Sequence, residues 1–314
     1  MSRLRSRSAL NHKNKLSKLS KLSQLINPPT LISMNLIQIL ILAIVQGAAE
    51  LLPVSSSAHV IMAEKLMGLD PTSPEMTLLL VMLHTGTMFA AIVYFWRSWK
   101  TTYFSSMAEF RVNVRFLIVA TVLTGIVGIG LLLIIKHVFI ANPSDFEIEH
   151  LFGNSTLMAC ALAAAGILII ASSRIKEQPH GQLSMSKAML IGAVQGLCLP
   201  FRGFSRSGAT ISTGLVAGVA RRKAEEFSFA LAVVLTPAVV LKEALRAYKA
   251  QAAAAISHSD MLVHLLLPSV FGMVFSFLAG LLALRWLSRW LEQDRWHFFG
   301  GYCLFAAVVV YLVG

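Results

Sequence analysis

Long apolar runs separated by short polar loops make up most of this chain. Five runs reach roughly 20 residues, the length at which an α-helix crosses the hydrocarbon core of a bilayer, and a sixth is slightly shorter. These runs predict an all-α polytopic membrane protein. The predicted spans are residues 76–96, 116–135, 151–172, 227–247, 261–286 and 296–313.

Two further regions are apolar but interrupted. In residues 34–67 an apolar segment meets Glu50 and Pro53, and only a short apolar stretch follows. In residues 187–222 the segment breaks at Pro200, and the remainder is again too short to span. Irregular backbone at membrane depth is tolerated only where protein or a water-filled cavity surrounds it. We therefore predict two re-entrant helical hairpins.

The order of these elements predicts an internal duplication. A hairpin and three spans are followed by a second hairpin and three spans, and an odd number of spans inverts the second half relative to the first. The tripeptide Val-Gln-Gly occurs in both hairpins, 149 residues apart. We expect a single membrane domain, 34–314, made of inverted repeats 34–172 and 187–314.

Composition and charge fit this class. The chain has 314 residues, of which 56% are hydrophobic and 13% charged, and its mean hydropathy is +0.70. The net charge of +12 does not indicate nucleic-acid binding, because most basic residues flank apolar runs. Loops 97–115, 173–187, 221–226 and 285–295 hold 13 Lys and Arg, against 5 in 64–75, 136–150 and 242–260. The positive-inside rule therefore puts the mouth of the first hairpin on the outer side.

The first 33 residues form a basic extension without acidic residues. Leucines at every third position could form a weak amphipathic helix at a membrane surface, and a disordered tail is the alternative. The basic residues contradict the predicted orientation if they lie outside. Either Met34 is the real start or the first hairpin is a full span, and we favour Met34, with residues 1–33 upstream of the real start.

Gln46–His59 (QGAAELLPVSSSAH) carries the first set of chemical groups. Gln46 and Glu50 are four residues apart on one helix face, where an amide and a carboxylate can hold a hydrated divalent cation or merely tie the hairpin together. Hydroxyls beside an imidazole, Ser55–Ser57 and His59, suit nucleophilic attack with general-base help. Serines before an apolar helix are also ordinary N-caps.

Gln195–Thr210 (QGLCLPFRGFSRSGAT) carries the second set. Backbone N–H groups at a helix N-terminus cradle anions, and Arg206 adds a planar fork that matches phosphate oxygens. Hydroxyl donors follow at Ser205, Ser207 and Thr210. A static ion pair between Arg206 and Glu50 is the structural alternative. Together the two motifs suit hydrolysis of a phosphate ester or anhydride that carries a lipid tail. A lipid-phosphate transporter or flippase is the alternative function.

At these motifs the sequence resembles the bacterial undecaprenyl-diphosphate phosphatase (bacitracin-resistance) family. The family's first motif reads approximately [E/Q]-G-x-T-E-F-L-P-x-S-S-[ST]-G-H and its second P-G-x-S-R-S-G-x-T. The run LHTGTMFAAIVYF at 83–95 is also similar, so the resemblance covers essentially residues 34–314.

The resemblance implies removal of the terminal phosphate from undecaprenyl diphosphate, which recycles the lipid carrier of the cell wall. It implies a site open to the periplasmic side of the bacterial inner membrane and a divalent cation, Mg²⁺ or Ca²⁺. A homodimer is an open alternative for the assembly.

The resemblance also implies roles for residues. Glu50, with Gln46 nearby, would serve the metal and the diphosphate, and Arg206 would neutralise phosphate charge. Ser56 would be the nucleophile with His59 as its base, or His59 would itself attack. Phosphate-binding hydroxyls would be Ser55, Ser57, Ser205, Ser207 and Thr210.

Four positions call for separate expectations. Gln46 stands where many relatives have glutamate, and Ala58 replaces a glycine, which restricts the backbone there. The family's adjacent Pro-Gly is split here by Phe201-Arg202, and we predict that Arg202 binds the distal phosphate. His84, inside a predicted span, is interpreted as a satisfied helix–helix contact.

Overall fold

A computed structural model describes residues 35–69, 74–139, 154–201, 203–254 and 266–313. The N-terminal extension and Arg202 therefore lie outside the described residues. Every element within them is helical. The helices, in chain order, are α2 (Leu36–Leu51), α3 (Ser56–Leu66), α4 (Pro74–Tyr103), α5 (Met107–Ile134), the π-helical turn η1 (Ile135–Phe139), α7 (Ser155–Ser173), α8 (Met185–Leu197), α9 (Arg206–Val216), α10 (Arg221–Ala254), α12 (Leu267–Glu292) and α13 (Trp296–Val313).

Six helices are long and apolar enough to cross a membrane, which confirms the predicted multi-pass membrane protein. They are Leu78–Tyr103, Met107–His137, Ser155–Ser173, Arg221–Leu241, Leu267–Glu292 and Trp296–Val313. Helix α5 illustrates why a long apolar run predicts a membrane-spanning helix. Its exposed positions Ile118, Val122, Ile126 and Ile129 recur every three or four residues, so one whole face is apolar and unpartnered within the described chain.

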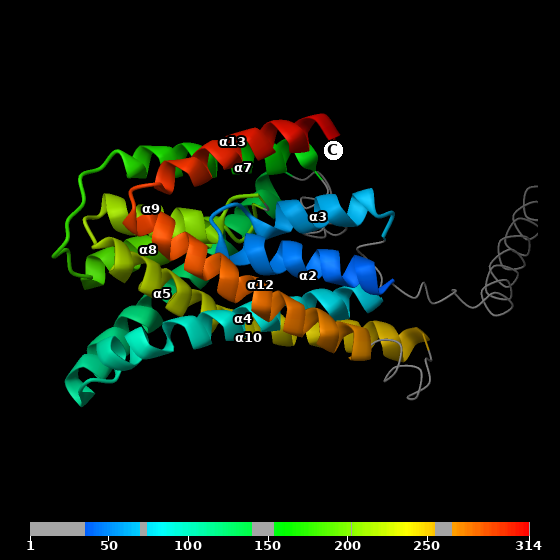
Figure 1. Ribbon diagram of the computed structural model, residues 1–314, viewed down its shortest axis with the longest axis horizontal. Helices are drawn as coiled ribbons and strands as arrows, with labels where there is room; N and C mark the ends of the chain where they lie inside the picture. Colours follow the sequence, from blue (N-terminus) through cyan, green and yellow to red (C-terminus); the bar gives the residue numbers. More distant parts are fainter. Residues whose placement is uncertain (1–34, 70–73, 140–153, 202, 255–265, 314) are drawn as a thin grey trace, which may run out of the picture. The chain divides into compact units, whose positions relative to one another are not determined.

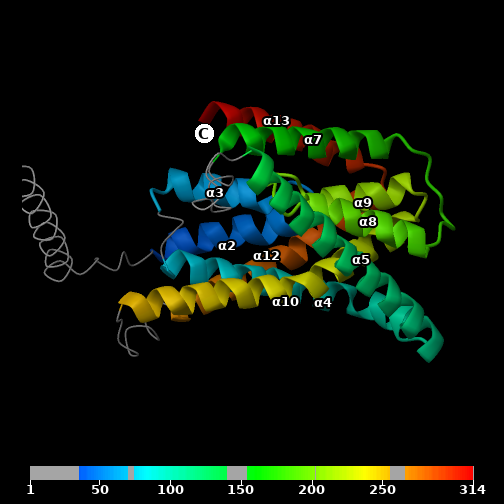
Figure 2. The same cartoon turned by 180° about the vertical axis from the view of Figure 1, so that it is seen from behind.

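The two interrupted regions fold as two pairs of short helices. Helices α3 and α9 have 11 residues each, or about 16 Å of length, roughly half of a hydrocarbon core of about 30 Å. The hairpins α2–α3 and α8–α9 lie between the pair α7 and α13 on one side and the pair α4 and α10 on the other (Figures 1 and 2). Their connecting turns meet, because the Ser207 hydroxyl donates to the Leu52 carbonyl at 3.1 Å.

Several helix contacts occur in matching pairs in the two halves of the chain. Helix α2 packs on α12, and α8 packs on α5, while α7 pairs with α13 and α4 with α10. These contacts exchange with one another when α2, α4, α5 and α7 are matched with α8, α10, α12 and α13, whereas the contact between α4 and α12 is much more extensive than its counterpart between α10 and α5. The inverted orientation of the two halves stays a prediction.

The Val-Gln-Gly echo is explained by close packing. A Cβ added at Gly47 would lie 2.6 Å from the carbonyl oxygen of Ser276 on α12. A Cβ added at Gly196, the matching position of the second hairpin, would lie 2.8 Å from the carbonyl oxygen of Thr124 on α5. Small residues let helices approach closely. Each hairpin therefore requires glycine at this position in order to pack against a long helix of the other half.

Candidate functional site

The two sequence motifs share one pocket. Glu50 closes helix α2, Ser56 begins α3 and Arg206 begins α9, so three helix ends converge there. The cavity volume is about 130 Å³, and the pocket is partly open to the surroundings. Its lining residues are Ala49, Glu50, Ser55, Ser56, Ser57, Cys198, Phe201, Phe204, Ser205, Arg206 and Ser207.

Glu50 is the centre of the polar contacts. Its Oε1 accepts a hydrogen bond from Arg206 Nη2 at 3.0 Å. Its Oε2 accepts from Ser56 Oγ at 2.5 Å and from Gln46 Nε2 at 3.2 Å. The ion pair considered as a structural alternative is therefore present, but it lines a pocket. Arg206 Nη1 is buried and has no hydrogen-bond partner among the described residues, so one edge of the guanidinium is left for another acceptor.

His84 makes the helix–helix contact that the sequence predicted, and its partner on α2 is Glu50. Its Nε2 lies 3.7 Å from Glu50 Oε2, and its Nδ1 lies 2.8 Å from the Leu80 carbonyl oxygen one turn earlier on α4. The sequence signal that could have found it was the LHTGT run, where an imidazole stands in an otherwise apolar helix.

The serine–histidine pair is not assembled. Ser56 donates to Glu50, while both ring nitrogens of His59 have other partners. His59 Nδ1 lies 2.8 Å from the Ser55 carbonyl oxygen, and Nε2 lies 2.6 Å from the hydroxyl of Tyr302 on α13. Among the described residues, His59 makes no hydrogen bond to Ser56. Tyr302 was not among the predicted site residues, because nothing local in the sequence links two positions 243 residues apart.

Ser55, in the turn between α2 and α3, has a strained backbone. It has φ 68° and ψ 95°, and it is one of two non-glycine residues with positive φ in the described chain. Ser55 Oγ lies 3.3 Å from Ser57 Oγ. Ala58, the replaced glycine, lies within α3 and is buried, so it adopts ordinary helical backbone and its Cβ is accommodated. Strained backbone of this kind persists where the surroundings hold it and is concentrated at functional sites.

The phosphate-binding hydroxyls predicted in the second motif divide into two groups. Ser205 and Ser207 line the pocket, where Ser205 Oγ caps α9 by accepting from Gly208 N at 3.2 Å. Thr210 points into the protein instead: it is fully buried, donates to the Arg206 carbonyl at 2.8 Å and lies 2.6 Å from the Ser228 hydroxyl. The structure therefore places Thr210 behind Arg206, away from the pocket.

A glycine shapes the turn before Arg206. Gly203 has φ 104°, and a Cβ there would lie 2.4 Å from the carbonyl oxygen of Met158 on α7. Only glycine takes this conformation without strain and also permits this approach. The turn that follows Pro200 thus packs tightly against α7.

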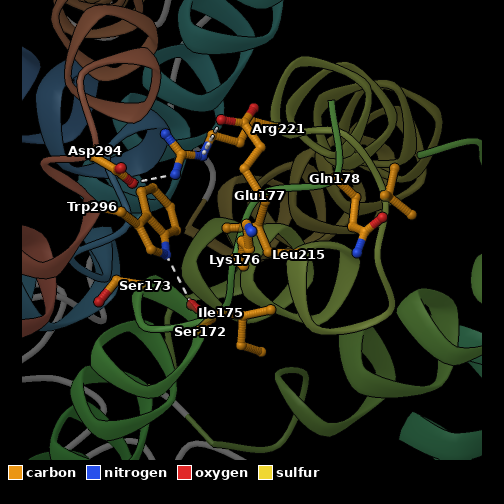
Figure 3. A pocket seen from close by; sticks show the side chains of 11 residues that line it. Ser172, Ser173, Ile175, Lys176, Glu177, Gln178, Leu215, Arg221, Asp294 and Trp296 are labelled. Atoms are coloured by element: carbon orange, nitrogen blue, oxygen red, sulfur yellow. Dashed lines mark hydrogen bonds and ion pairs between the residues drawn. The ribbon is translucent and has the colours of Figure 1, made fainter. Parts of the chain in front are cut away.

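A second pocket lies near the C-terminal end of α9 and has a different character. Arg221 fills one side, paired with Asp294 and with Glu177 Oε2 at 3.5 Å (Figure 3). It also donates to the Leu291 carbonyl at 3.1 Å. Trp296 donates from its indole nitrogen to Ser172 Oγ at 3.1 Å. These groups satisfy one another, which indicates a structural junction.

The donor set around Glu50 fits one kind of cation. The described residues contain no group of three or more His, Cys, Asp or Glu side chains arranged for a metal. One carboxylate, with the Gln46 amide beside it, matches a hard divalent cation that keeps several waters and shares phosphate oxygens with a substrate. It does not match a cation held by protein atoms alone.

The sequence of this chain is similar to those of known proteins. A family model described as Bacitracin resistance protein BacA matches residues 39–309. Undecaprenyl-diphosphatase 2 of Acinetobacter baylyi is 64% identical over 281 residues, which cover 89% of this chain and 99% of that protein. Undecaprenyl-diphosphatase 2 of Burkholderia ambifaria is 33% identical over 290 residues, covering 88% and 95% of the two chains. For the undecaprenyl-diphosphatase of Rhodopirellula baltica the identity is 31% over 283 residues, with 89% and 98% covered. The chain therefore belongs to the bacitracin resistance protein BacA family.

Proposed function

We propose that this protein is an integral membrane phosphatase that hydrolyses undecaprenyl diphosphate to undecaprenyl phosphate and inorganic phosphate. The observation that carries the proposal is the Glu50–Ser56–Arg206 constellation in a pocket among apolar helices, with one buried guanidinium nitrogen still to be satisfied. Relatives named undecaprenyl-diphosphatase support the substrate. They do not favour the transporter alternative, which would leave the Ser56–Glu50 contact without a use.

Arg206 and the start of α9 hold the terminal phosphate. The guanidinium offers its free Nη1 and neutralises phosphate charge, while backbone N–H groups at the helix start favour an anion. Once a phosphate competes for Arg206, Glu50 loses part of its ion pairing and becomes a better proton acceptor. Substrate binding therefore prepares the carboxylate for the chemical step.

Ser56 performs the attack in this proposal. Its Oγ attacks the terminal phosphorus while its proton passes to Glu50 Oε2, and the phosphoanhydride bond breaks to release undecaprenyl phosphate. A water molecule then attacks the phosphorus of the phosphoserine, the bond to Ser56 Oγ breaks, Glu50 returns its proton to Oγ, and inorganic phosphate leaves. The Ser56 Oγ lies 2.5 Å from Glu50 Oε2, which favours Ser56 over His59, whose ring nitrogens are occupied by the Ser55 carbonyl and the Tyr302 hydroxyl.

A divalent cation, Mg²⁺ or Ca²⁺, belongs to the proposal as a cofactor. It would be held by Glu50 with Gln46 nearby, and it would neutralise charge on the diphosphate. Arg202, which precedes the turn at Gly203, is proposed to bind the distal phosphate. An Arg202→Ala variant should raise the KM for a diphosphate substrate, and unchanged kinetics would reduce Arg202 to a turn residue.

The location we propose is the bacterial inner membrane, with the pocket open to the periplasmic side. The supporting observation is the excess of Lys and Arg in loops 97–115, 173–187, 221–226 and 285–295, which the positive-inside rule assigns to the cytoplasm.

Phosphate release by purified protein tests the function. Undecaprenyl or farnesyl diphosphate is supplied in detergent or liposomes, with Mg²⁺, with Ca²⁺, or with a chelator. We expect release of one phosphate per substrate, and its loss on chelation. Activity that survives both chelation and Glu50→Ala would exclude the metal role, and a well-folded protein that releases no phosphate under any condition would exclude the function.

A further inference from the structure

His59 is fixed by partners on both sides of its ring. The Ser55 carbonyl can only accept, so Nδ1 carries the proton of the contact at 2.8 Å. In the neutral ring Nε2 is then an acceptor, and the Tyr302 hydroxyl donates to it at 2.6 Å. The two rings stack with centroids 5.6 Å apart and planes 15° from parallel. The Ser55 carbonyl therefore selects the tautomer of His59, and Tyr302 fixes the orientation of its ring.

The atom that His59 holds is the carbonyl oxygen of the strained residue. Ser55 has positive φ, which costs a non-glycine residue roughly 1–3 kcal/mol and requires external support. Its own side chain caps nothing in α3. The peptide that follows Ser55 leads directly into Ser56, so rotation of this carbonyl would move Ser56 Oγ away from Glu50.

Helix α13 supports the same turn at a second point. Cys303, next to Tyr302 in the chain, donates from Sγ to the Pro53 carbonyl at 3.2 Å. Cys303 is fully buried, so this contact is part of the packed interior. Two successive residues of α13 thus contact the Pro53–Ser56 turn and its histidine, although they lie about 250 positions away in the sequence.

We propose that Tyr302 is a positioning residue for the phosphatase reaction. It anchors the His59 ring so that Nδ1–H faces the Ser55 carbonyl, His59 holds that carbonyl, and the turn presents Ser56 to Glu50 and the substrate phosphorus. This inference rests on the proposed function and assigns His59 a positioning role in it. The contact is made between α3 and α13, outside the residues that line the pocket.

The first test removes one oxygen atom. We expect Tyr302→Phe to lower kcat for farnesyl diphosphate by roughly tenfold or more, because misplacing a reacting group by about 1 Å can cost up to a hundredfold. KM should change less than twofold, as should binding of a farnesyl methylenediphosphonate that cannot be hydrolysed. Tyr311→Phe, on the same helix and exposed, is the matched control and should behave as wild type. Melting temperatures of all variants establish that folding is intact.

The second test uses His59 itself. The side-chain amide of His59→Asn can place an N–H close to the position of Nδ1, so it can hold the Ser55 carbonyl without Tyr302. We expect His59→Asn to retain much more activity than His59→Ala, and Tyr302→Phe to add no further loss on the His59→Asn background. Equal inactivity of His59→Asn and His59→Ala would show that the imidazole reacts directly and would overturn the proposal.

The outcomes distinguish a failure of the proposed phosphatase function from a failure of the positioning role of Tyr302. Wild-type protein without phosphatase activity would remove the proposed function and this inference with it. An active wild type and an equally active Tyr302→Phe variant would remove the inference alone. A fall in kcat accompanied by an equal loss of analogue binding would assign Tyr302 to substrate binding and would likewise overturn the positioning role.

Discussion

At the scale of single residues, Glu50 brings together hydrogen-bond donors from three helices. It pairs with a guanidinium, accepts from a serine hydroxyl and an amide, and lies 3.7 Å from an imidazole nitrogen. A buried carboxylate with several donors is well stabilised as an anion, and it can accept a proton only when one donor leaves. The substrate phosphate, by competing for Arg206, supplies that condition.

Glu50→Gln tests the carboxylate with little change of shape. The amide cannot take the Ser56 proton or anchor a cation, so we expect kcat to fall by roughly 10²–10⁴-fold, the usual contribution of a general base. The rate of phosphate release from farnesyl diphosphate measures this change in kcat. Glu177→Gln is the control, because Glu177 belongs to the Arg221 junction and should leave kcat unchanged. A Glu50→Gln variant within tenfold of wild type would contradict the proposed base.

Arg206 is tested by comparing two substitutions. Arg206→Ala removes the phosphate partner, and we expect a loss of roughly 10²–10³-fold, as for other groups that stabilise transition-state charge. Arg206→Lys keeps the charge but loses the fork that contacts two acceptors at once, so its activity should lie between those of Ala and wild type. Steady-state kinetics with a melting curve for each variant distinguish this from unfolding. Equal activity of Lys and Ala variants would show that charge alone is of no use at this position.

At the scale of elements, the sequence predicted helices better than it predicted their contacts. Apolar runs and breaks near Pro53 and Pro200 located the six spans and both hairpins, because length and hydropathy are local properties. The grouping of Glu50 with Arg206 was predicted from chemistry, since a buried arginine requires an anion. His84 and Tyr302 were not predicted as site residues, because their contacts depend on how α4 and α13 pack. No periodicity in either helix indicates that packing.

Gly203 tests the turn between α8 and α9. Its positive φ and its approach to the Met158 carbonyl both oppose a side chain, so Gly203→Ala should destabilise the protein by roughly 1–3 kcal/mol and shift the start of α9. We expect a lower melting temperature together with reduced kcat. Gly301→Ala is the matched control, since a Cβ there meets nothing within 4 Å. Equal melting temperatures for the two variants would contradict the tight packing.

At the scale of the whole molecule, two clusters of polar groups among the described helices lie at opposite ends of α9. The end that begins at Arg206 carries the reactive pocket, and the end near Leu215 carries the Arg221 junction, whose charges are paired. Arg222 and Lys223, in the first turn of α10, follow Arg221 of that junction in the sequence. The positive-inside rule predicts that this end faces the cytoplasm.

Membrane orientation can be measured with single cysteines. In a background without Cys160 and Cys198, and with the buried Cys303 retained, Leu66→Cys after the first hairpin and Ser105→Cys between α4 and α5 occupy exposed positions. Both are placed in cells whose outer membrane has been made permeable, and a maleimide that does not cross the inner membrane is added. We expect Leu66→Cys to react at once and Ser105→Cys only after the inner membrane is opened, because basic loops are retained in the cytoplasm. The reverse pattern would put the pocket of Glu50 and Arg206 on the cytoplasmic side, and lipid carrier released outside the cell could then reach it only after crossing the membrane.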